Sequence, residues 1–137
     1  MVAGEGYVIG IDFGLKHLGV AVGQTITGTA SGLSTLKARN GKPNWSEVDE
    51  LLIQYRPIAL VVGLPLNMDG SHSDMSRRAN TFAQRIARRT HLPTYLADER
   101  LSSWAAIDDD VLTGDIHARS ACLIAETFLN DFSVACR

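Results

Sequence analysis

The stretch Tyr7-Val8-Ile9-Gly10-Ile11-Asp12 decides the fold, because a short apolar run that ends in an acid is typical of a buried strand. Gly14 lets the chain turn after it. Residues 18–23 form a second apolar strand, and the Thr-, Ser- and Gly-rich residues 26–36 predict a third that is partly exposed. The spacing indicates two hairpins, so three antiparallel strands follow a loose tail of about residues 1–6.

Helices and strands alternate after the break Asn40-Gly41-Lys42-Pro43. Asn44 is typical of an N-cap, and Glu47 three residues later predicts a capping box. The first helix then ends before Pro57, and residues 58–62 are a continuous apolar strand of the kind found in a sheet covered on both faces. Apolar residues recur at helical spacing in the helix: Trp45, Val48, Leu52 and Tyr55.

The second half of the chain continues the alternation. We predict a loop over 63–70, a helix over 75–89, a strand over 94–97, a broken helix over 102–107, a loop over 108–114 and a last helix over 117–131. The order βββαβαβα predicts an α/β protein with a five-stranded mixed sheet and helices on both faces. This is the order of the RNase H-like fold, in one domain over residues 1–137.

The composition is that of an ordinary soluble protein. The chain has 137 residues, 45% of them hydrophobic, and a net charge of −2, so binding of nucleic acid requires a local basic patch. The two cysteines, Cys122 and Cys136, belong to no zinc-binding motif and suit a reducing cytosol. No signal peptide or membrane span is evident, so we expect a cytoplasmic protein.

Asp12 is the first candidate catalytic residue. Burying a bare carboxylate is costly unless it is paired or binds a cation, and Gly10 and Gly14 let a phosphate or another backbone come close. The alternative is a structural acid that caps the turn or pairs with Lys16. Actin-like ATPases begin with a similar motif, although this chain is too short for their second subdomain.

Asp98-Glu99-Arg100 is the second candidate, because it follows a strand at the edge where strand ends gather. Adjacent strand residues point to opposite faces, so one of the two acids faces the site, and Arg100 can pair with a phosphate. The alternative is a polar turn whose acids favour the start of a helix. Asn67 and Asp69 in the preceding loop can bind a metal or a hydroxyl, or can simply build a tight turn.

Basic residues gather on the helix over 75–89, which carries five arginines. Such contacts to phosphates supply most non-specific affinity for nucleic acid, although a solvated helix face is the alternative. His117 at the start of the last helix should point toward the sheet, either as a ligand or as a half-buried structural residue. The candidate nucleic-acid-binding residues are Lys16, Arg77, Arg78, Arg85, Arg89 and Arg100.

Four segments together resemble the YqgF (RuvX) family, a RuvC-like branch of the RNase H-like superfamily. They run in order along the chain: residues 9–14 (IGIDFG), 19–23 (GVAVG), 62–70 (VGLPLNMDG) and 98–102 (DERLS). The resemblance implies a nuclease that matures the 5′ end of pre-16S ribosomal RNA, with ribosomal proteins as candidate partners. It also implies that Asp12 and Glu99 are catalytic. His117 stands where the family usually has an aspartate, and Asp115 is a substitute ligand.

The resemblance implies hydrolysis of a phosphodiester bond with Mg²⁺ or Mn²⁺ held by Asp12, Glu99 and either His117 or Asp115. Two other functions remain open. One is a structure-selective DNA resolvase acting on branched DNA, usually as a homodimer rather than a monomer. The other is a non-catalytic RNA-binding module of ribosome assembly with a degraded site, which His117 in place of the acid would suit.

Overall fold

A computed structural model describes residues 5–67, 69–98 and 116–135 of the chain, and the side chains among them up to Asn130 except that of Asp98. The helix predicted over 102–107 and the loop over 108–114 lie outside these residues, as does most of the predicted tail. Gly6, at the end of that tail, is held by Thr25, whose hydroxyl accepts from the Gly6 amide at 3.0 Å. The single domain over 1–137 stays a prediction.

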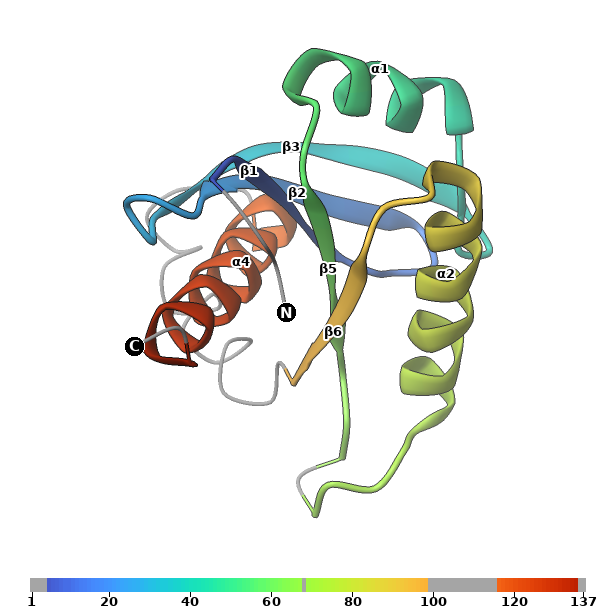
Figure 1. Ribbon diagram of the computed structural model, residues 1–137. Coiled ribbons are helices and arrows are strands. Elements are labelled where there is room, and N and C mark those ends of the chain that lie inside the picture. Colours follow the sequence, from blue (N-terminus) through green and yellow to red (C-terminus); the bar gives the residue numbers. More distant parts are fainter. Residues whose placement is uncertain (1–4, 68, 99–115, 136–137) are drawn as a thin grey trace.

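The strands form one mixed sheet with the order β4-β3-β2-β1-β5-β6 (Figure 1). The pairs β1–β2, β2–β3 and β3–β4 are antiparallel, and β1–β5 and β5–β6 are parallel. The predicted architecture is therefore confirmed, with β5 between β1 and β6. The strands are β1 (Tyr7–Asp12), β2 (His17–Gln24), β3 (Ala30–Arg39), β4 (Lys42–Pro43), β5 (Ala59–Leu64) and β6 (Thr94–Asp98).

Two details of the predicted sheet were wrong. The third strand begins at Ala30 rather than at residue 26, because the chain first turns: the Gly28 amide bonds the Gln24 carbonyl at 3.0 Å. The sheet also has six strands rather than five. Asn40 and Gly41 adopt φ angles of 52° and 80°, the pair of positive values that a tight hairpin turn requires, and β4 folds back on β3.

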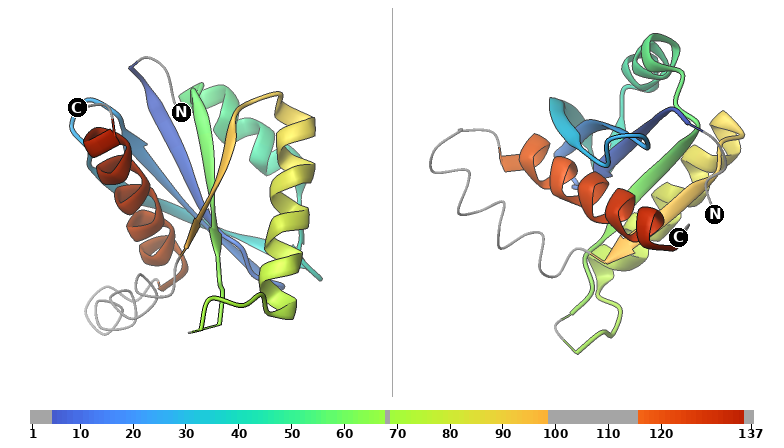
Figure 2. Two further views of the ribbon diagram at one scale, coloured as in Figure 1. Left: turned by 60° about the horizontal axis from the view of Figure 1, so that its bottom comes forward. Right: turned by 60° about the vertical axis from the view of Figure 1, so that its left-hand side comes forward.

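The helices lie on both faces of the sheet, as predicted. Figures 1 and 2 show α1 (Trp45–Tyr55) and α2 (Asp74–Thr90) on one side of the sheet and α4 (Ile116–Ala135) on the other. Among the residues that the structure describes, no helix is long and apolar enough to span a bilayer. Helix α2 begins with Asp74, which gives the arginine-rich helix one acid in its first turn.

The start of α1 corrects one local prediction. Asn44 is the N-cap, but its side chain accepts from the Ser46 amide at 3.0 Å. The predicted capping box would use the Glu47 amide, which instead donates to the Asn44 backbone carbonyl at 3.0 Å. Because the cap is complete without Glu47, the side chain of Glu47 is left exposed on the first turn.

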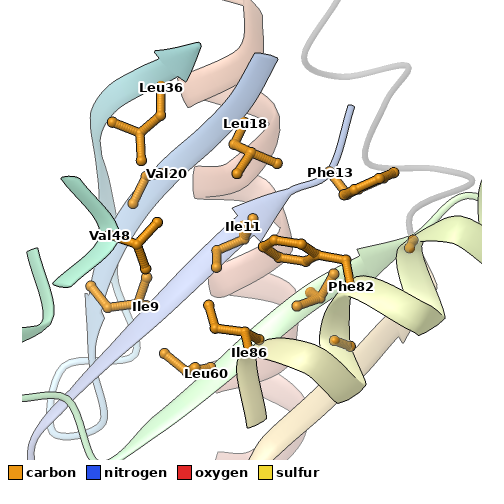
Figure 3. Close-up of a cluster of buried hydrophobic side chains, with 13 residues drawn as sticks. Ile9, Ile11, Phe13, Leu18, Val20, Leu36, Val48, Leu60, Phe82 and Ile86 are labelled. Carbon is orange, nitrogen blue, oxygen red and sulfur yellow. The ribbon is translucent and has the colours of Figure 1, made fainter. Parts of the chain in front are cut away.

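Alternation along β1 divides the core into two layers. Ile9 and Ile11 pack with Phe82 and Ile86 of α2 beneath α1 and α2 (Figure 3). Val8 faces the other way and packs with residues of α4. Even-numbered residues of β1 therefore face α4, which we call the α4 face of the sheet.

Helix α4 lies close to the sheet because small residues line the α4 face. A Cβ added at Gly10 would come within 2.9 Å of the Ala121 carbonyl oxygen. A Cβ added at Gly19 would overlap the His117 carbonyl group. These glycines therefore set how near the first turns of α4 can approach β1 and β2.

Candidate catalytic site

Asp12 is the last residue of β1 and is half-buried. Its place in the alternation with Val8 and Gly10 puts it on the α4 face. Its Cα partner on β2 is Gly19, over which the backbone of His117 lies. The sheet pairing thus brings the first catalytic candidate beside the start of α4.

His117 lies in the first turn of α4, where its ring stacks on that of His17. The ring centroids are 4.6 Å apart and the planes differ by 19°. His17 begins β2 and belongs to the same face as Gly19, two residues further along the strand. The α4 face therefore carries one carboxylate and two imidazoles near the carboxyl end of β1.

Strand β6 ends at the same edge of the sheet. Asp98 of β6 pairs in register with Leu64 of β5. On its other side β5 pairs with β1, where Val62 is the partner of Ile11. Strand β5 therefore separates β1 from β6. Tyr95 and Ala97 pack in the cluster beneath α4. Glu99 and Arg100, like Asp115, lie outside the described residues.

The metal ligands predicted from the sequence are thus only partly placed. Among the described residues, no group of three or more His, Cys, Asp and Glu side chains lies close enough to hold a metal ion. Two of the four predicted ligands, Glu99 and Asp115, belong to the part that is not described. Lys16 is exposed in the loop between β1 and β2, and its carbonyl accepts from the Ala38 amide at 2.8 Å.

Four of the five arginines of α2 are candidate binding residues, and they fall into two groups. Arg77, Arg78 and Arg85 line a cleft of about 280 Å³ against the β3–β4 hairpin. Arg89 instead makes two hydrogen bonds to Asp49 of α1, at 2.8 and 3.2 Å, and its guanidinium lies 5.1 Å from the centroid of the Trp45 ring. The hydrogen bond from Arg89 lowers the pKa of Asp49.

The loop after β5 is held together by its own polar groups. The Asp69 carboxylate accepts from the Ser71 amide at 2.9 Å and from the Ser71 hydroxyl at 2.6 Å, and the Asn67 amide group donates to the same hydroxyl at 3.1 Å. Ser73 caps α2 through a capping box with Ser76. Asn67 and Asp69 are therefore engaged in the turn that leads to α2.

His17 lies beside the candidate site and was not among the residues predicted from the sequence. It follows Lys16 directly and begins a strand whose alternate residues, Gly19 and Ala21, face α4. That alternation was readable from the sequence. The close approach of His117, which makes His17 relevant, depends on the packing of α4.

Comparison with known proteins decides the family. The family model RuvX, described as Holliday junction resolvase, matches residues 6–131. The chain belongs to the RuvX family. It is 50% identical over 107 residues to a protein of Pseudomonas putida named "Putative pre-16S rRNA nuclease", covering 78% of this chain and 76% of the relative. It is 44% identical over 130 residues to a relative of the same name from Pseudomonas aeruginosa, covering 89% and 90%.

Solved structures confirm the RNase H-like fold of this RuvX chain. The structure of T. thermophilus RuvC in complex with a Holliday junction substrate superposes with a TM-score of 0.56 over 95% of both chains, at 19% identity. The Fowlpox virus resolvase with its Holliday junction DNA gives a TM-score of 0.57 over 92% of this chain and 98% of that one, at 13% identity.

Proposed function

We propose that this RuvX protein is a metal-dependent nuclease that hydrolyses phosphodiester bonds at the carboxyl end of β1. The observation that carries the proposal is the place of Asp12, which lies on the α4 face opposite Gly19 and beside the first turn of α4. A carboxylate at a strand end, in a family described as resolvases, supports a role for Asp12 in holding the metal ions that would act on a phosphate.

The donors at this site suit a hard divalent cation. Asp12 supplies carboxylate oxygens and His117 an imidazole, ligands compatible with Mg²⁺ or Mn²⁺. Glu99 is the proposed second acid because of the family resemblance, and it follows β6, whose Tyr95 and Ala97 pack beneath α4. When bound, two such ions would relieve charge on the phosphate and activate a water.

His117 or Asp115 would complete the ligand set. His117 lies in the first turn of α4, the turn that is beside Asp12. Its ring stacks on that of His17, with the ring centroids 4.6 Å apart, and this contact restricts how the His117 ring can turn. Lys16, Arg100 and four of the five arginines of α2 would hold phosphates of the substrate, the four being Arg77, Arg78, Arg85 and Arg89. Arg89 would contribute least, because Asp49 already accepts two hydrogen bonds from it.

Ribosomal RNA is the substrate that the curated relatives support best. Relatives at 44% and 50% identity carry the name "Putative pre-16S rRNA nuclease", which supports pre-16S rRNA as the substrate. Maturation of its 5′ end, in the cytoplasm, is the part of the proposal that rests on the family resemblance alone. Branched DNA is the second candidate, since the matching family model is described as a Holliday junction resolvase. A non-catalytic RNA-binding assembly factor is the alternative that His117, in place of an acid, would suit.

A side-by-side assay separates these functions. Purified protein is given Mn²⁺ and either a pre-16S 5′-leader RNA or a four-way DNA junction, with Asp12→Asn as the control. We expect the wild-type protein to cleave the RNA and the Asp12→Asn variant not to cleave it. Cleavage of the junction alone would establish the resolvase, and binding of RNA without cleavage would establish the assembly factor.

A further inference from the structure

A cleft opens on the side of the sheet opposite Asp12, between the turn of the β3–β4 hairpin and one face of α2. Its volume is about 280 Å³. Four cationic side chains line it, one from the hairpin and three from the helix: Lys42, Arg77, Arg78 and Arg85. This is a high density of positive charge for a chain whose net charge is −2.

Most of this charge is not neutralised within the described residues. Arg78 pairs with Asp74 at 3.3 Å and donates to the Asn40 side chain at 3.4 Å, which links the helix to the hairpin. Lys42, Arg77 and Arg85 form no ion pair with any residue that the structure describes. Their positive charges remain available to an anion entering the cleft.

The floor of the cleft is apolar and closed. Phe13 and Phe82 lie there with ring centroids 5.3 Å apart, and they are only 8% and 4% exposed. Rings so deeply buried offer no free face on which a base could stack. The cleft can therefore recognise phosphates, through its cationic rim, but not the identity of bases.

The hairpin is fixed to the segment that follows Asp12. The Gly41 amide donates to the Leu15 carbonyl at 2.9 Å, and a Cβ at Gly41 would come within 2.8 Å of the Phe13 ring. Phe13, which lines the cleft, directly follows Asp12, so their Cα atoms are about 3.8 Å apart. A nucleic acid strand bound in the cleft would therefore lie next to the end of β1, although the Asp12 side chain is on the other face of the sheet.

We propose that this cleft is a subsite for the phosphodiester backbone of a nucleic acid strand, next to the bond that is cut at Asp12. The inference rests on the proposed nuclease function and names how that site holds its substrate. It predicts binding that depends on salt and not on base sequence, carried by Arg77, Arg85 and Lys42.

The test compares Arg77→Gln/Arg85→Gln with Arg88→Gln, an exposed arginine of the same helix that does not line the cleft. A fluorescent leader RNA is titrated in EDTA, which separates binding from cleavage, at several KCl concentrations. We expect the double variant to raise Kd on the order of tenfold and to lower the salt slope by about 1.4 to 1.8. Arg88→Gln should change Kd by less than about twofold.

Unchanged affinity and slope in the double variant would overturn the subsite, even if Asp12-dependent cleavage is intact. If the wild-type protein binds the RNA through the cleft but does not cleave it when Mn²⁺ is added, the proposed nuclease function would be overturned and the subsite would stand. Inorganic phosphate is titrated as a second probe: weak, millimolar competition is expected. Saturable micromolar binding of phosphate that leaves RNA binding unaltered would show a site for a small anion and contradict the proposal.

Discussion

The imidazole of His117 lies nearly parallel to that of His17, with ring centroids 4.6 Å apart. This contact joins the first turn of α4 to the start of β2, on the face of the sheet that carries Asp12. The family resemblance implies an acid at the position of His117, so neighbours must hold the His117 ring in place if it is to act as a ligand. His17 is the neighbour that the structure provides.

Substituting His17 tests whether the stack orients His117. His17→Ala should weaken apparent Mn²⁺ affinity about two- to tenfold, because aromatic pairs of this kind contribute about 0.5–1.5 kcal/mol. His17→Phe keeps the ring contact and should stay near wild type. Isothermal titration with Mn²⁺ measures both, and equal affinities for the alanine and phenylalanine variants would show that the stack does not matter.

Gly19 sets the distance between β2 and α4. Gly19→Ala should destabilise the fold by about 1–3 kcal/mol, since its Cβ would overlap the His117 carbonyl group and force the helix outward. Gly32→Ala is the graded control, because its Cβ would lie 3.3 Å from atoms of Ala118 in the same helix. Urea unfolding should give the larger loss for Gly19; equal losses would argue against the close approach.

Cys122 should be unreactive in the folded protein. Burial, followed by the nearby Glu126 carboxylate, raises the pKa of the Cys122 thiol from 9.0 to about 11. The thiol also donates to the Ala30 carbonyl at 3.2 Å. A Cys136→Ser variant, which leaves one thiol, should therefore react with a disulfide reagent at pH 8 only after unfolding in urea.

The raised pKa of the Cys122 thiol also predicts how the stability of the fold depends on pH. The folded pKa is raised, so the stabilisation is fully present below about pH 9 and is lost as pH rises toward about 11, where the folded thiol also ionises. Replacing Cys122 by Ala should flatten this alkaline decline in urea midpoints. Rapid labelling of the folded protein at pH 8 would contradict the buried position.

The Arg89–Asp49 pair ties α2 to α1. Arg89 lowers the pKa of Asp49 chiefly through their hydrogen bond, so the pair stabilises above the ordinary carboxyl pKa of 3.8 and loses its effect as pH falls through the lowered value. Asp49→Asn should lower Tm slightly at pH 7 and not at all at pH 2. High salt should shrink the difference, because both side chains are exposed.

The order of strands and helices was predictable because each element carries its own period in the sequence. Asp12 was identifiable for the same reason: an acid at the end of an apolar strand is conspicuous. The additional strand β4 was not predictable, because the pair Asn40-Gly41 is equally typical of a break between elements and of a hairpin turn. The turn at 25–28, which delays β3, leaves no apolar pattern at all.

The site was less predictable than the fold. The sequence grouped Arg89 with Arg78 and Arg85 as candidate nucleic-acid-binding residues, but it could not show that Asp49 of another helix would engage Arg89. Asp69 had two readings from the sequence, and its hydrogen bonds to Ser71 place it in the turn. His17 gained meaning only once α4 was seen to pack on Gly19.

The most direct test of the central claim is the single-turnover rate of Mn²⁺-dependent cleavage of the leader RNA by wild type and Asp12→Asn. Glu47→Gln, which removes an exposed acid on α1, is the matched control. Loss of a principal metal ligand should slow cleavage by about a thousandfold or more, while the control stays within about twofold. An Asp12→Asn protein that still cleaves at the wild-type rate would contradict the account.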